Sequence, residues 1–168
     1  MGQRFSGNIM RKPADESAPL PTLGEIGINQ FAPYLMNRIT ARWNANIAEA
    51  LKAHDITTTQ MRALAILSLS SSVTINELSV YTVIEQSTMS RTLDTLEEQG
   101  LIRRQPRPED MRIRDVSITE DGRAAFASVW PTMHDLFQQL FDGVGEEDYR
   151  IFISTLHRIL RNVRKHDI

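Results

Sequence analysis

Arginines supply the chemistry that stands out in this sequence, because they make up 16 of its 19 Lys and Arg residues. Five arginines and only two acids lie between Leu101 and Arg114, so this stretch has a local net charge of +3. The five are Arg103, Arg104, Arg107, Arg112 and Arg114. A guanidinium can hold a phosphate or a guanine base through two parallel hydrogen bonds. The stretch is therefore either a nucleic-acid surface or a solvated run of charge, and the elements around it decide between the two.

A second group of polar side chains opens the helix that we predict from Glu85 or Gln86 to Gln99. Its members are Gln86, Ser87, Thr88, Ser90 and Arg91. Short hydroxyls and a guanidinium at the start of a helix can bond phosphates or base edges. Serine and threonine in this position are also ordinary capping residues. The arginine-rich stretch directly downstream favours the DNA-binding interpretation.

Motifs for catalysis or metal binding do not occur in the sequence. The chain has no cysteine, which excludes disulfides, thiol nucleophiles, cysteine–zinc sites and cysteine-based redox sensing. Its four histidines show no metal or triad spacing. A glycine-rich phosphate loop and a serine nucleophile elbow are both missing. We therefore predict no catalytic residue, no cofactor and no metal site.

The overall charge has to be divided by region before it says anything about partners. The chain of 168 residues has about the length of one domain, and its formal charge is −2. Residues 57–118 hold seven arginines and eight acids, so positive charge is confined to one short stretch. We expect a narrow, shaped DNA contact with modest non-specific affinity. No apolar run approaches the ~20 residues of a membrane helix, and we expect a cytoplasmic protein without membrane partners.

The N-terminal part is predicted to contain a tail and a long helix. Residues 1–23 hold prolines among serine, alanine and acids without an apolar period, which indicates a flexible tail. From Ile26 to Ala53, apolar residues recur every three or four positions and predict one helix. A helix of this length exceeds what one small lobe can cover, so we expect its surplus to pack on a partner.

Three shorter helices are predicted next. Capping boxes that begin at Thr57 and Thr74 indicate helices over residues 57–69 and 74–81. The third helix is the one over residues 86–99, which presents the polar group at its start.

The periodicity changes after Gly100, which stands where a left-handed residue ends a helix. Residues 101–105 and 112–118 are predicted to be strands, with Val116 and Ile118 as the buried pair of the second. The hairpin tip is predicted to contain Pro106, Pro108, Glu109 and Asp110. A connection of six residues is too long for a tight turn, so we expect a protruding tip.

Two long helices are predicted to complete the chain. Thr119 caps a helix over residues 120–142, and Pro131 inside it should kink or break it. A glycine turn over residues 143–145 leads to a last helix over 146–165, whose apolar residues approximate a heptad seam.

This order of elements predicts a mainly α protein with a small β-hairpin wing, that is, a winged helix-turn-helix. Residues 24–168 are expected to form a single domain. Its DNA-binding lobe is expected over residues 56–119, between helical segments over 24–55 and 120–168.

The sequence resembles the MarR family of bacterial transcription regulators from Ile26 to Arg164. The matching segments are Ile56–Gln60, Glu77–Leu78, Ser87–Arg91, Leu96–Arg104, Asp110–Arg112 and Ser117–Gly122. No single segment is specific, but the ordered set with these spacings is. Thr82–Val83 departs from the family, where many members have Leu-Gly, and Gln86 replaces a residue that is often basic.

The resemblance implies an obligate homodimer whose recognition helices bind DNA. It also implies that the helices over residues 24–55 and 120–168 form a helical dimerisation lobe. It implies that Ser87, Thr88, Ser90 and Arg91 face DNA. It also implies that Asp110 orients a wing arginine and that Arg112 meets the DNA backbone or minor groove. The full predicted DNA-binding set is Gln86, Ser87, Thr88, Ser90, Arg91, Arg104, Arg107, Asp110 and Arg112. A two-fold dimer should read a pseudo-palindrome with half-sites about one turn (~10 bp) apart.

Family members often respond to small ligands, so we expect a repressor released by an aromatic acid, a phenolic compound or an acyl-CoA thioester. The predicted ligand-binding residues are Phe31, Tyr34, Arg38, Arg42, His54 and Met61. The arginines among them can also simply pair with acids or reach solvent. Two other functions stay open: a constitutive or architectural DNA-binding protein without a ligand and, with less support, an enzyme.

Overall fold

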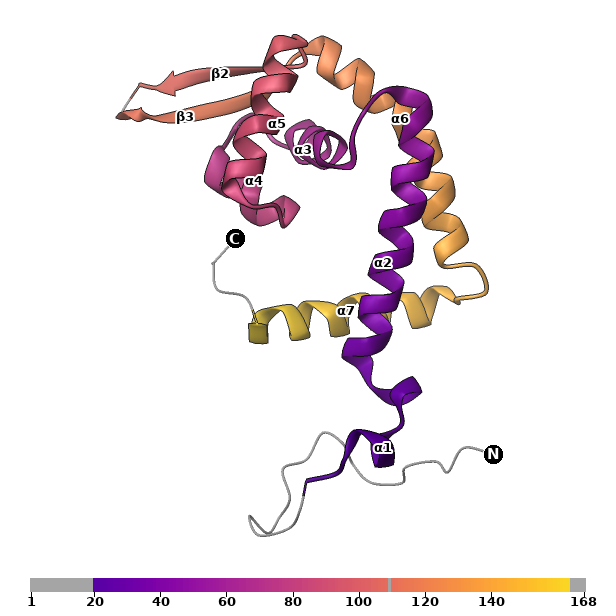
Figure 1. The fold of residues 1–168 in the computed structure, drawn as a ribbon. Helices are drawn as coiled ribbons and strands as arrows, with labels where there is room; N and C mark the ends of the chain where they lie inside the picture. Colours follow the sequence, from indigo (N-terminus) through magenta and orange to yellow (C-terminus); the bar gives the residue numbers. More distant parts are fainter. Residues whose placement is uncertain (1–19, 109, 164–168) are drawn as a thin grey trace. The chain divides into compact units, whose positions relative to one another are not determined.

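The computed structural model describes residues 20–108 and 110–163 (Figure 1). Of the predicted elements, residues 1–19 of the tail, Glu109 at the hairpin tip, and Arg164 and Lys165 at the end of the last helix lie outside the described residues. The chain divides into two compact units between Ala45 and Asn46.

The first unit contains a helical turn, a 3₁₀ turn and most of helix α2 (Ala32–Leu51). The prediction of one continuous helix from Ile26 to Ala53 is therefore wrong at its start. Helix α1 (Leu23–Ile26) ends at Gly27, whose φ of 80° is incompatible with an α-helix, and η1 (Ile28–Gln30) follows. At the other end α2 stops at Leu51 and gives way to the 3₁₀ turn η2 (Lys52–His54).

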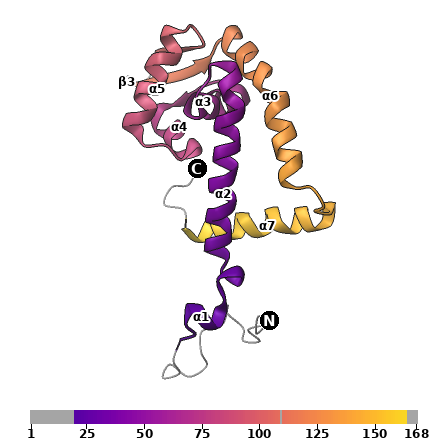
Figure 2. The ribbon, with the colours of Figure 1, turned by 45° about the vertical axis from the view of Figure 1, so that its right-hand side comes forward.

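Helices α3 (Thr58–Leu69), α4 (Ile75–Thr82) and α5 (Gln86–Glu98) form the helical part of the second unit. Both predicted capping boxes are confirmed, because Thr57 and Thr74 each accept from the backbone N–H three residues on while that residue's side chain accepts from the cap N–H. Both views show α3, α4 and α5 grouped together, with β3 beside them (Figure 2).

A small antiparallel sheet of strand order β1-β3-β2 completes this part of the unit. Its strands are β1 (Val73–Thr74), β2 (Ile102–Arg107) and β3 (Asp110–Ile118). The sequence did not reveal β1, because two residues are too short to show a period. The prediction of a six-residue tip is wrong: pairing continues to Arg107 opposite Asp110. Pro106 is tolerated because β2 is an edge strand and its register shifts at this point.

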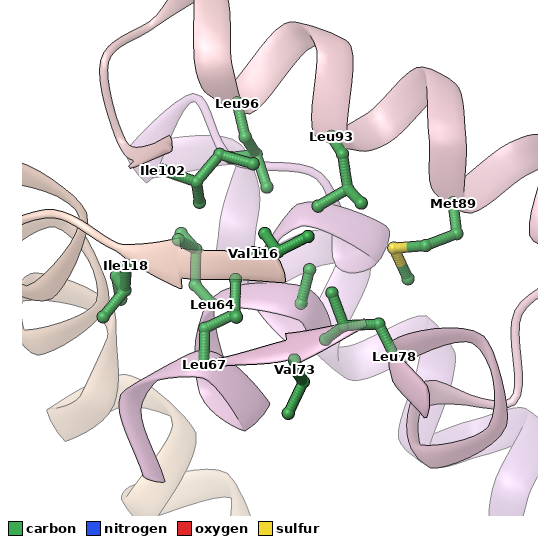
Figure 3. Close-up of a cluster of buried hydrophobic side chains, with 11 residues drawn as sticks. Leu64, Leu67, Val73, Leu78, Met89, Leu93, Leu96, Ile102, Val116 and Ile118 are labelled. Carbon is green, nitrogen blue, oxygen red and sulfur yellow. The ribbon is translucent and has the colours of Figure 1, made fainter. Parts of the chain in front are cut away.

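The core lies between α5, the sheet and α3. Figure 3 shows Leu93 and Leu96 pointing from α5 toward Val116 of β3, with Leu64 and Leu67 of α3 beyond the strand. The buried cluster comprises Ala63, Leu64, Leu67, Val73, Leu78, Met89, Leu93, Leu96, Ile102, Val116 and Ile118. The predicted burial of Val116 and Ile118 is confirmed.

Two long helices follow, α6 (Glu120–Leu140) and α7 (Glu146–Val163). Thr119 caps α6 as predicted, and its side chain accepts from the Gly122 N–H at 3.1 Å. Pro131 does not break α6, which remains one helix through it. Val129 and Met133 on either side are buried, so their packing offsets the hydrogen bond that proline removes.

Candidate nucleic-acid interface

The start of α5 presents a row of exposed polar side chains. Gln86, Ser87, Thr88 and Arg91 are exposed, and Ser90 is half-buried. The opposite face of α5 is anchored in the core by Met89 and Leu93, neither of which has measurable exposure. Because these apolar residues fix the rotation of the helix, the polar row points away from the core and is accessible to a binding partner.

Arg107 is held at the far end of the β2–β3 wing by an acid on the neighbouring strand. Its Nη2 lies 2.6 Å from Oδ1 of Asp115, and its Nε donates to Oδ2 at 3.1 Å. This two-bond contact holds the pKa of the Asp115 carboxyl below its ordinary value. The guanidinium plane is therefore oriented by the strand pairing.

Arg104, which the sequence places among the DNA contacts, is bound instead to two acids of α5. Its Nη1 lies 2.8 Å from Asp94 Oδ1 and its Nη2 lies 2.6 Å from Glu97 Oε2. The Arg104 backbone N–H also donates to Glu97 Oε1 at 2.9 Å. The side chain is only 17% exposed. The hydrogen bond with Glu97 is the main cause that raises the pKa of Arg104 and lowers the pKa of Glu97. Arg104 thus ties the wing to α5.

Asp110 and Arg112 meet at the tip, where both are exposed. Asp110 Oδ1 accepts from the Arg112 backbone N–H at 3.0 Å, which fixes the direction of the chain there. Within residues 20–108 and 110–163, neither Arg112 nor Arg91 forms an ion pair. These two guanidinium groups are available to an anionic partner.

Sequence reasoning missed the acids that partner the arginines. Asp94 and Glu97 are three residues apart on a predicted helix and so share a face, which was a usable signal. That β2 passes this face was not visible from spacing. Asp115 faces Arg107 only because the register pairs Gln105 with Asp115. Arg103 is likewise engaged, since its Nε donates to Ser117 Oγ at 3.0 Å.

The predicted ligand-binding residues fall in both units. Phe31, Tyr34, Arg38 and Arg42 lie in the first unit, where the Arg38 guanidinium carbon is 5.8 Å from the centre of the Tyr34 ring. His54 and Met61 lie in the second, and Met61 is buried. The four residues of the first unit and the two of the second are therefore each described within their own unit.

A groove of about 470 Å³ lies between α3 and α6 of the second unit. Its lining is largely apolar and consists of Ala65, Ser68, Leu69, Phe126, Ala127, Trp130 and Pro131. None of the six predicted ligand residues lines it. In the described part of the chain, no group of three or more acids and histidines can hold a metal ion, and no helix is long and apolar enough to cross a membrane.

Comparison with known proteins identifies this architecture. The MarR family model matches residues 54–113. The HTH-type transcriptional repressor IacR of Pseudomonas putida is 29% identical over 143 residues, which cover 85% of this chain and 83% of IacR. The crystal structure of a MarR-family transcriptional regulator from Silicibacter pomeroyi superposes with a TM-score of 0.83 at 41% identity, covering 88% of this chain and all of that one.

The same fold occurs in an E. coli MarR variant crystallised with operator DNA, at a TM-score of 0.68 and 24% identity over 79% of this chain and 97% of that one. The named relatives are regulators of transcription. The exposed polar row on α5, the paired wing and these matches lead to one conclusion: the chain belongs to the MarR family of DNA-binding transcriptional regulators.

Proposed function

We propose that this protein is a homodimeric repressor that binds a pseudo-palindromic operator through α5 and the wing, and that a small effector releases it. The observation that carries the DNA-binding part is the exposed row of Ser87, Thr88 and Arg91 on a helix whose opposite face is locked into the core. A helix so presented fits the major groove. Two such helices related by a dimer axis read half-sites about 10 bp apart.

The wing residues then divide by role. Arg112 is exposed and unpaired among the described residues, and suits the DNA backbone or the minor groove. Arg107 is 36% exposed and held in direction by Asp115, so it can approach a phosphate without reorganising. Asp110 sets the backbone direction at Arg112. Arg104 contributes by holding the wing against α5, since both its carboxylate partners belong to that helix.

Dimerisation is supported by apolar surface that one chain leaves exposed. Helix α7 has no buried residue among its 18, yet carries Ile151, Phe152, Ile159, Leu160 and Val163 with 37–67% exposure. On α2, Leu35, Met36 and Ile39 are similarly exposed. Contiguous apolar helix faces of this kind mark association sites. We therefore assign residues 24–55 and 120–168 to dimerisation and 56–119 to DNA binding.

The repressor role rests on the relative IacR, which is named as a repressor. Effector binding is supported by the groove between α3 and α6, whose volume of about 470 Å³ lies within the range of small-molecule sites. Trp130 and Phe126 in its lining favour an aromatic compound. The six predicted ligand residues remain candidates for a second part of the effector contact.

The DNA-binding proposal is tested with a duplex that the wild-type protein enriches from a randomised pool. Arg91→Ala should weaken binding to this duplex about tenfold or more and change base preference. Arg158→Ala removes an exposed arginine of α7 and serves as the control with unchanged binding. Normal binding by Arg91→Ala would show that α5 is not the recognition helix.

The effector proposal is tested by thermal shift against aromatic acids, phenolic compounds and acyl-CoA thioesters, repeated with the duplex present. A true effector raises Tm of the free protein and displaces the duplex. Trp130→Ala should reduce both effects. If no compound displaces DNA, the protein is a constitutive DNA-binding regulator.

A further inference from the structure

The turn between α4 and α5 contains a residue in an unfavourable conformation. Val83 has φ 56° and ψ 48°, in the left-handed region. Its N–H donates to the Val80 carbonyl at 3.2 Å, and the Ile84 N–H donates to the Ser79 carbonyl at 3.0 Å. These two bonds define a Schellman motif, whose left-handed position usually holds glycine or asparagine. A β-branched residue there is a genuine outlier, because its side chain crowds the backbone.

Contacts within the chain explain why the turn is left-handed, but they do not explain why a valine occupies this position. Thr82 is buried and its hydroxyl donates to the Leu78 carbonyl at 2.6 Å, while Ile84 packs against the core cluster. These neighbours force the left-handed geometry on position 83. Val83 is 86% exposed, so its side chain has little packing to offset the strain. Glycine would satisfy the fold better, which indicates that the side chain acts on something outside the chain.

The position of Val83 indicates what that is. Val83 stands three residues before Gln86, the first residue of α5. It therefore lies next to the N-terminal end of the proposed recognition helix, which is the end that enters the major groove. In that groove the apolar group of DNA is the C5 methyl of thymine. We propose that Val83 is a specificity-determining residue that contacts a thymine methyl in each half-site. This inference rests on the proposed function.

The substitution Val83→Gly distinguishes an effect on folding stability from an effect on DNA binding. It should raise Tm by about 2–4 °C because the strain is relieved, and it should weaken binding to the enriched duplex by about fourfold per half-site. Asp55→Gly is the matched control: Asp55 is also left-handed, with φ 52°, but lies before α3. It should leave DNA binding unchanged.

The methyl group is tested by replacing each thymine of the duplex in turn with deoxyuridine. At one position per half-site, the replacement should weaken wild-type binding about fourfold and leave Val83→Gly binding unchanged. Equal losses in both proteins at every position, or unchanged affinity of Val83→Gly, would overturn the inference. A uniform loss by Val83→Gly with no sensitive thymine would assign the contact to the deoxyribose and also overturn it. Failure of the wild type to enrich any duplex would instead refute the proposed function.

Discussion

The winged-helix part and helix α7 use apolar residues in opposite ways. In the first, 11 apolar residues of α3–α5 and the sheet form one buried cluster. In the second, an equally helical segment buries none of its residues, and Leu160 and Ile151 are more than half exposed. One chain is therefore sufficient for the DNA-binding core, whereas α7 needs a further apolar surface to remove its residues from water.

The arginines also fall into two groups, according to whether the chain itself supplies their ion-pair partners. On the wing, Arg104 and Arg107 are each bound to carboxylates of the chain itself. At the start of α5 and near the tip, Arg91 and Arg112 have no ion-pair partner in the described residues. In the proposed function, the paired arginines shape the DNA interface and the unpaired ones supply its charge.

The largest expected effect is on the winged-helix core, through Gly122. This buried glycine lies in the first turn of α6, where an added Cβ would overlap the Leu101 carbonyl oxygen and lie 2.8 Å from Ile118 Cγ1. Gly122→Ala should destabilise the fold by about 3 kcal/mol or more, because a backbone carbonyl must move. The measurement is denaturant unfolding. Gly145→Ala, whose Cβ meets nothing closer than 3.9 Å, is the control and should be nearly neutral.

The next effect is on α7. Leu160→Glu places a charge on the exposed apolar face and should cost about 2 kcal/mol or more of association while leaving the winged-helix core folded. Light scattering should show half the wild-type mass at the same concentration. Arg150→Ala breaks only an exposed pair with Glu147 and should leave the mass unchanged. An unchanged mass for Leu160→Glu would place the self-association surface elsewhere.

A smaller effect separates the paired from the unpaired arginines. Arg104→Ala should reduce stability by about 1–2 kcal/mol, since its carboxylate partners are partly exposed and screened. The salt dependence of DNA binding should stay the same, because the charge of Arg104 is already neutralised by Asp94 and Glu97. Arg112→Ala should instead reduce the slope by about one per half-site with no change in stability. A reduced slope for Arg104→Ala would make it a phosphate contact, as spacing alone predicts.

The smallest effect is a pH dependence of the wing. Arg104 lowers the pKa of Glu97 from 4.5, and Arg107 lowers the pKa of Asp115 from 3.8. The unfolded chain therefore takes up protons first as the solution is acidified. The stabilisation is fully present above those ordinary values and is lost as pH falls through the lowered ones. Tm of the wild type should fall more steeply below about pH 4.5 than Tm of Arg104→Ala. Parallel profiles would show that the Glu97 pair does not stabilise the fold.

Local signals predicted most elements, and most of the errors concern contacts between segments that are distant in the sequence. The caps at Thr57, Thr74 and Thr119 were right because an N-cap bond joins a side chain to a backbone N–H only three residues on. The missed strand β1 and the extended hairpin depend on pairing with β3. The break at Gly27 is a local signal that the apolar period concealed.

The sequence by itself determined the winged-helix order of elements, the burial of Val116 and Ile118 and the polar row at the start of α5. Each follows from periodicity or capping within one segment. Only the tertiary structure decided which arginines are neutralised and that Val83 is strained with its side chain in water. Ion pairs form where separate segments meet, and a left-handed turn is imposed by the packing of its neighbours, so neither can be read from the spacing of residues along the chain.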